Sequence, residues 1–92
     1  MKILIAIEPG LSDALKREVT HAIGRQQRPS ILIFANMWLV DSPRRSTTEW
    51  MEIVRDALGR DDARILVVEV DAWTMRAPQY IRDEVSRIMR AP

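Results

Sequence analysis

The stretch ILIFANMWLVD, residues 31–41, decides how this chain folds. It is rich in β-branched and aromatic side chains, and it is longer than a single ordinary strand, which averages about five or six residues. In its middle, Ala35-Asn36 supplies a residue that tolerates positive φ and therefore suits a tight turn. We predict two strands, residues 31–34 and 37–41, joined as a hairpin.

Strand and helix signals also lie on the N-terminal side of this hairpin. Residues 3–7 are a short β-branched run that stops at the Glu-Pro-Gly of residues 8–10, which is typical of a buried strand followed by a turn. Apolar residues then recur at helical spacing, with Ser12 placed to cap the helix and Gly24 to end it. Residues 25–30 are polar and contain a proline, which predicts a connecting loop.

The C-terminal side repeats the helix and strand signals. Ser46 and Glu49 form a capping box, and the helix that follows should end at Gly59. Residues 65–70 are another β-branched strand. Pro78 marks the first turn of a last helix. Its apolar stripe consists of Ile81, Val85, Ile88 and Met89.

The resulting order is strand, helix, strand, strand, helix, strand. This order matches the split βαβ arrangement of ferredoxin-like domains. We therefore predict an α+β fold, a ferredoxin-like βαββαβ sandwich with a four-stranded antiparallel sheet and an additional C-terminal helix. A single domain should span residues 1–92, with its core in residues 1–71 and the helical extension in residues 72–92.

Composition narrows the classes of function. The chain has 92 residues, 47% of them hydrophobic and 29% charged, with a net charge of +1 and no cysteine. The small net charge argues against binding nucleic acid by bulk charge alone. Without cysteine there are no disulfides, thiolate zinc sites or cysteine nucleophiles. No apolar run approaches the length of a membrane span, so we expect a cytoplasmic protein with no membrane partner.

Both faces of the predicted sheet are apolar. The helices of this fold cover only one face, so an isolated domain should show strands that alternate between apolar and polar residues. Here Ile3, Ile5 and Ile7 would lie on one face of the sheet and Leu4 and Ala6 on the other, and all five residues are apolar. The second face must therefore be covered, either by the C-terminal helix or by a second copy of the chain. We expect a homodimer, with the terminal helix at its edge.

The residues from the predicted third strand to the fourth strand resemble the pattern of a known family. The sequence WLVDS at residues 38–42 precedes a capped helix, the acidic pair at residues 61–62 and the strand RILVVEV at residues 64–70. This pattern resembles the ferredoxin-like family of small CRISPR-associated adaptation endoribonucleases and their stand-alone relatives. In that family a Trp-Leu-Val strand, a helix, an acidic turn and a strand of the (Leu/Ile)-Val-Val-Glu-Val type occur in this order. The resemblance covers about the first three quarters of this chain.

The resemblance implies metal-dependent phosphodiester cleavage across a dimer. The family places an acid at the end of its first strand, usually an Asp after a Tyr, whereas here Glu8 follows Ile7. A glutamate can bind Mg²⁺, but its longer side chain moves the carboxylate. This departure bears on catalysis more than on the fold. The C-terminal segment also differs, because it is helical here where many family members exchange a strand.

We further expect the acidic residues to meet at one rim of the sheet. Taking the first and third strands as parallel neighbours and the fourth as running the opposite way, we expect the ends of the first and third strands and the start of the fourth to share this rim. The carboxylates that would meet there belong to Glu8, Asp41 and either Asp61 or Asp62. Such a cluster could hold Mg²⁺ and activate water, with Arg44 and Arg45 binding the backbone of RNA or DNA.

Each of these residues also has a purely structural interpretation. Asp41 with Ser42 could shape the turn, the acidic pair could solvate a loop, and the two arginines could neutralise their neighbours. His21 should face solvent on the polar side of the first helix, with no nucleophile beside it. Trp50 belongs to an apolar helical stripe and should be core. Trp38 and Trp73 could lie in the core, at an interface or against a base, with core or interface favoured.

Two classes of function therefore remain open. One is a small dimeric relative of the CRISPR-associated endoribonucleases with a weak or vestigial Mg²⁺-dependent nuclease or nucleic-acid-binding activity. The other is a non-catalytic dimeric interaction or regulatory module, for example of the toxin–antitoxin type. The sequence leaves open whether the protein is an enzyme, and the residue at position 8 discriminates between the two classes.

Overall fold

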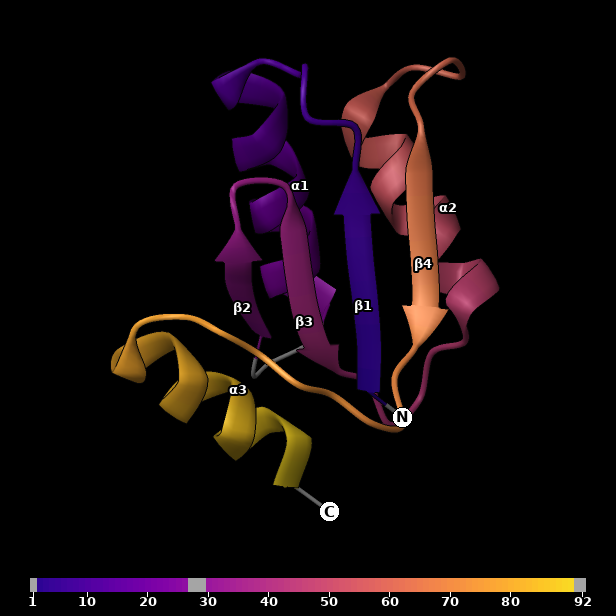
Figure 1. Ribbon diagram of the computed structural model, residues 1–92. Helices are drawn as coiled ribbons and strands as arrows, with labels where there is room; N and C mark the ends of the chain where they lie inside the picture. The colour runs from indigo at the N-terminus through magenta and orange to yellow at the C-terminus, as the bar shows by residue number, and fades with distance from the viewer. Residues whose placement is uncertain (1, 27–29, 91–92) are drawn as a thin grey trace.

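The four strands form one antiparallel sheet in the order β2-β3-β1-β4. The computed structural model describes residues 2–26 and 30–90. The elements are β1 (Lys2–Ile7), α1 (Asp13–Gln26), β2 (Ser30–Phe34), β3 (Met37–Asp41), α2 (Thr47–Leu58), β4 (Ile65–Glu69) and α3 (Gln79–Arg90). Helices α1 and α2 lie behind the sheet and α3 lies in front of it, as Figure 1 shows. The predicted ferredoxin-like α+β fold with a C-terminal helix is confirmed.

The central strand β1 pairs with β3 on one side and β4 on the other, antiparallel in both cases. The expectation that the first and third strands are parallel is therefore wrong. The α1 crossover makes β2 run in the same direction as β1, and the hairpin then reverses the chain, so β3 must run against β1. The two ends of the sheet consequently hold different residues from those expected.

The predicted hairpin is present, but its turn works differently from the prediction. Among the described residues, positive φ occurs only at Gly59, with φ 64°, so Asn36 does not adopt it. Instead Asn36 binds the end of β1: its Nδ2 donates to the Ile7 carbonyl at 2.7 Å, and its carbonyl accepts the Ile7 N–H at 3.0 Å. The side chain thus fastens the hairpin turn to the central strand.

Three of the four predicted helix caps are present. The capping box of Ser46 and Glu49 is formed at the start of α2, and Gly59 ends that helix in the left-handed conformation. Ser12 caps α1, its Oγ accepting the Leu15 N–H at 3.3 Å. Gly24, however, does not end α1, which continues to Gln26. Residues 27–29 of the predicted loop lie outside the described residues.

Two apolar clusters lie on opposite faces of the sheet. The larger is between the sheet and helices α1 and α2, and it includes Trp38 and Trp50, as expected for Trp50. The smaller is between the other face and α3, around Leu39, Val85 and Ile88. We call the face turned away from α1 and α2 the open face. Helix α3 packs mainly against β2 and β3, so it covers part of the open face and leaves Leu66 of β4 exposed.

One buried polar pair inside the larger cluster sets up a test of this packing. Ser42 is fully buried, and its Oγ accepts the indole N–H of Trp50 at 2.8 Å while donating to the Arg45 carbonyl at 3.2 Å. We predict that Ser42→Ala lowers the free energy of unfolding by about 1–3 kcal/mol, because it strands the buried indole N–H. Urea unfolding of Ser42→Ala, Trp50→Phe and the double variant should show that the two losses are not additive. Additive losses would contradict the bond.

Candidate functional site

Glu8 lies directly after β1, where it fastens this strand to β4. Its backbone N–H donates to the Arg64 carbonyl at 3.0 Å, and its Oε1 accepts the Arg64 N–H at 3.0 Å. The carboxylate therefore accepts a backbone N–H that has no carbonyl acceptor on the neighbouring strand, because the hydrogen bonds between β1 and β4 end here. Its observed role is structural.

Asp41 lies at the opposite end of the sheet. It is opposite Lys2 in the β1–β3 register, and its Oδ1 is 2.9 Å from the Lys2 Nζ. Both side chains of this ion pair are only 13% exposed. The length of β1, about 20 Å at the usual rise per residue, separates Asp41 from Glu8. The predicted meeting of Glu8 and Asp41 at one rim is wrong, because β1 and β3 are antiparallel.

The acidic loop before β4 shares the end of the sheet where Glu8 lies. Asp62 is held by Arg60, whose Nε and Nη2 donate to its two carboxylate oxygens at 3.0 Å each. These hydrogen bonds lower the pKa of Asp62, and the same contact raises the pKa of Arg60, with a smaller contribution from Glu8. Asp61 is exposed. Arg60 therefore neutralises Asp62 at this end of the sheet.

These residues do not fit the Mg²⁺ site that the resemblance implies. Mg²⁺ needs closely spaced oxygen ligands in near-octahedral geometry. In the part of the chain that the structure describes, no three acidic or histidine side chains come together in a way that could hold a metal ion. Glu8, Asp41 and Asp62 are each engaged in a different contact. No reaction step through a metal follows from this arrangement.

The basic pair Arg44 and Arg45 lies in the loop after β3, at the Asp41 end and away from Glu8. Arg45 is committed to its neighbours: its Nη2 donates to Gln26 Oε1 at 2.6 Å, and its Nη1 lies 3.6 Å from Glu49 Oε2. Arg44 is exposed. The arrangement matches the structural interpretation for Arg45, while Arg44 is available to a ligand.

The remaining aromatic and histidine candidates divide between core and surface. Trp38 is 2% exposed, and its Nε1 donates to Thr20 Oγ1 at 3.1 Å, so it is a core residue. His21 is exposed on α1, as predicted. Trp73 is 40% exposed and lines a groove on the open face. Trp73 is therefore the surface tryptophan, and the groove beside it is the candidate site.

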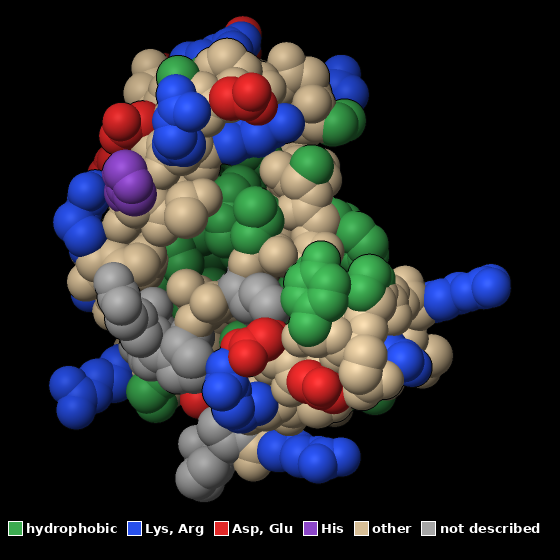
Figure 2. All heavy atoms as spheres, turned by 90° about the vertical axis from the view of Figure 1, so that its left-hand side faces the viewer, with side chains coloured by type: hydrophobic (Ala, Val, Ile, Leu, Met, Phe, Trp, Pro, Cys, Tyr) green, Lys and Arg blue, Asp and Glu red, His purple; other side chains and the backbone are tan. Residues whose placement is uncertain are grey.

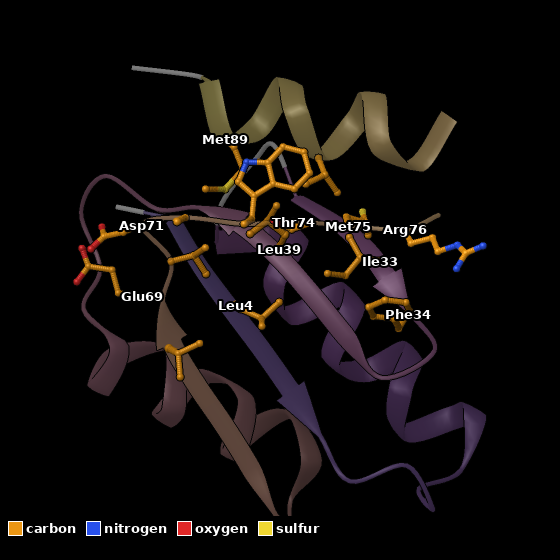
Figure 3. A pocket seen from close by; sticks show the side chains of 15 residues that line it. Leu4, Ile33, Phe34, Leu39, Glu69, Asp71, Thr74, Met75, Arg76 and Met89 are labelled. Atoms are coloured by element: carbon orange, nitrogen blue, oxygen red, sulfur yellow. The ribbon is translucent and has the colours of Figure 1, made fainter. Parts of the chain in front are cut away.

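This groove was not predicted as a site. It has a volume of about 540 Å³ and lies between the open face, the segment after β4 and helix α3. Figure 3 shows Leu4 and Leu39 on its floor, with Met89 of α3 and Met75 near its upper side. The apolar character of both sheet faces was the sequence signal for it. Its position depends on where residues 70–78 cross the sheet, which no local pattern specifies.

Further apolar surface lies at the edge strand β2. Figure 2 shows hydrophobic side chains in a hollow on this side of the molecule, surrounded by scattered charged residues. Two exposed apolar residues of β2 are Leu32, at 44%, and Phe34, at 52%. Phe34 also lines the groove, whereas Leu32 does not. The groove therefore continues toward the β2 side through Phe34.

Comparisons with models of known families, with curated proteins and with solved structures returned no match for this chain. The resemblance to the CRISPR-associated endoribonucleases stays a prediction. No helix among the described residues is long and apolar enough to span a bilayer. The geometry of the groove and the contacts of the candidate residues are therefore what bears on function.

The contact between Glu8 and Arg64 gives a test of position 8. We predict that Glu8→Ala lowers the free energy of unfolding by about 1 kcal/mol, because the Arg64 N–H loses its acceptor. Glu8→Gln keeps an oxygen at that position and should stay close to the parent protein. Urea unfolding of both variants measures the difference. Equal losses in the two variants would show that the negative charge, and not the acceptor, is what position 8 supplies.

Proposed function

We propose that this protein is a non-catalytic interaction module that works as a homodimer, with the uncovered part of the open face as its interface. The observation that carries the proposal is the apolar surface over β1 and β4. Leu4 pairs with Val68 and Ala6 pairs with Leu66 in the sheet register, so these four side chains share the open face. Leu66 is 56% exposed, which is unusual for a leucine in the middle of a strand.

The cost of leaving this surface in water supports the proposal. Burying apolar surface contributes about 25 cal/mol per Å², so fully burying one leucine side chain is worth about 1.5–3 kcal/mol. Helix α3 already covers the β2–β3 part of the open face through Val85 and Ile88. A second copy would cover the β1–β4 part. Contiguous apolar patches on soluble proteins commonly mark such interaction sites.

The state of the candidate acids also supports a non-catalytic role. Glu8 accepts a backbone N–H, Asp41 pairs with Lys2, and Asp62 pairs with Arg60. These three carboxylates thus have partners within the chain, while Asp61 is exposed, and the two predicted catalytic residues lie at opposite ends of β1. The geometry therefore favours the interaction module over the nuclease, because Glu8 and Asp41 do not lie in one site.

Three further expectations belong to this proposal. A relation to the CRISPR-associated endoribonucleases would concern the fold and the dimer and not the chemistry. A cytoplasmic location is consistent with the absence of cysteine, because reducing compartments do not favour disulfide-bonded scaffolds. Binding of RNA or DNA is the alternative, and it would depend on Arg44, the exposed member of the basic pair.

The dimer is tested by placing a charge in its interface. We predict that Leu66→Asp raises the dimer dissociation constant at least about a hundredfold, because the carboxylate would be buried without a partner. The monomer should keep its stability, since Leu66 is already half exposed there. Sedimentation equilibrium measures the association, and circular dichroism reports the fold.

Leu32→Asp is the matched control for this experiment. Leu32 is similarly exposed but pairs with Trp38, so it lies on the helix side of the sheet. Its substitution should leave the dimer intact. A monomeric parent protein at micromolar concentration would overturn the proposal. So would RNA or DNA cleavage that requires Mg²⁺ and is lost in Glu8→Gln, since that result would establish the nuclease instead.

A further inference from the structure

The groove carries opposite charge at its two ends. Figure 3 shows the carboxylates of Glu69 and Asp71 together at one end and the guanidinium of Arg76 at the other, with Leu4 and Leu39 between them. All three charged residues are exposed. The groove is therefore an apolar strip with an acidic end and a basic end.

The charges at these two ends are unpaired within one chain. Over residues 2–26 and 30–90, the side chains of Glu69, Asp71 and Arg76 make no ion pair and no hydrogen bond. Some other surface charges are paired within the chain, as in the contact of Arg60 with Asp62. The charged side chains at both ends can therefore form ion pairs with another molecule without breaking a contact in their own chain.

On the basis of the proposed homodimer, we infer that the second copy lies across this groove in one orientation, with Asp71 and Glu69 of each copy facing Arg76 of the other. An apolar strip with one acidic and one basic end is complementary to a second copy of itself that runs in the opposite direction, because each acidic end then faces a basic end. The chain itself supplies that surface, and the two copies then form the same contacts in both directions.

Symmetry leaves two limiting arrangements. Two identical faces can pack on each other only if the two-fold axis lies in the plane of the interface. An axis along the groove places each end against its own copy, so Arg76 would meet Arg76. An axis across the groove exchanges the ends, so Arg76 meets Asp71. Electrostatic complementarity fixes the register of interfaces in this way and selects the second arrangement.

The apolar middle and the charged ends have separate roles in this arrangement. Trp73 lines the groove and is 40% exposed, so a partner can bury a large amphipathic side chain that the monomer leaves in water. Burial of Trp73 together with the partly exposed Leu4 supplies affinity. The charged ends, which lie at the rim, supply orientation.

Charge reversal tests the pairing of the ends. Arg76→Glu makes both ends acidic and should raise the dissociation constant roughly tenfold or more. Glu69→Lys with Asp71→Lys makes both ends basic and should do the same. The triple variant exchanges the two ends and should return to within about threefold of the parent dimer. An unchanged or tighter Arg76→Glu dimer would overturn the inference.

Cross-linking tests the orientation directly, because the chain has no cysteine of its own. Asp71→Cys and Arg76→Cys are prepared separately and treated with a short bismaleimide. Each variant alone should give little cross-linked dimer, and the mixture should give a strong cross-link between the two. Asp56→Cys, on α2 behind the sheet, is the control and should not cross-link with Arg76→Cys. Self-cross-linking of each single variant would establish the other axis and overturn the inference.

The outcomes separate this inference from the proposed function. A parent protein that is monomeric in sedimentation equilibrium contradicts both. A parent dimer that is dissociated by Leu66→Asp, but shows no cross-link in the mixture, keeps the proposed function and overturns the orientation. A dimer with the expected cross-link and the expected response to charge reversal supports both.

Discussion

The antiparallel pairing of β1 with β3 is the constraint on which the rest of the structure depends. It places Asp41 opposite Lys2 at one end of the sheet and brings the hairpin turn, through Asn36, to Ile7 at the other. Every candidate residue takes its position from this pairing. A reversal of strand direction would exchange the ends of β3 and would bring Asp41 to the same end as Glu8. The distance between these two carboxylates is therefore a consequence of topology and not of side-chain choice.

The element order could be predicted from the sequence alone, because it depends on local signals. The limits of α2 come from Ser46, Glu49 and Gly59, which act within one turn of the helix. The two-faced apolar character of β1 also follows directly from its period. Gly24 misled the prediction for α1, because a glycine costs a helix only about 1 kcal/mol, and the helix that buries Ile23 beside it continues to Gln26.

The candidate site depends on long-range pairing, and there the sequence is less informative. The hairpin reverses the chain before the third strand, and the expectation of parallel first and third strands leaves this reversal out. Asn36 is predicted to have a local backbone role, whereas it binds a carbonyl 29 residues away. The groove could not be predicted from the sequence for a different reason. Its walls are formed where residues 70–78 cross the open face, and the path of this segment depends on the packing of α3 against Leu39.

The contrast between satisfied and unsatisfied groups shows where function is to be sought in so small a domain. Glu8 and Asp41, the two predicted catalytic residues, are used by the fold itself, so freeing either of them would weaken a contact. The groove has the opposite character, with a half-exposed Trp73, a leucine floor and, at both ends, charges that no described residue pairs. A chain of this size buries only about 60–65% of the surface that its unfolded form exposes. Helix α3 covers part of the remainder on β2 and β3, while Leu66 of β4 stays exposed, and this is the surface that the proposed second copy would cover.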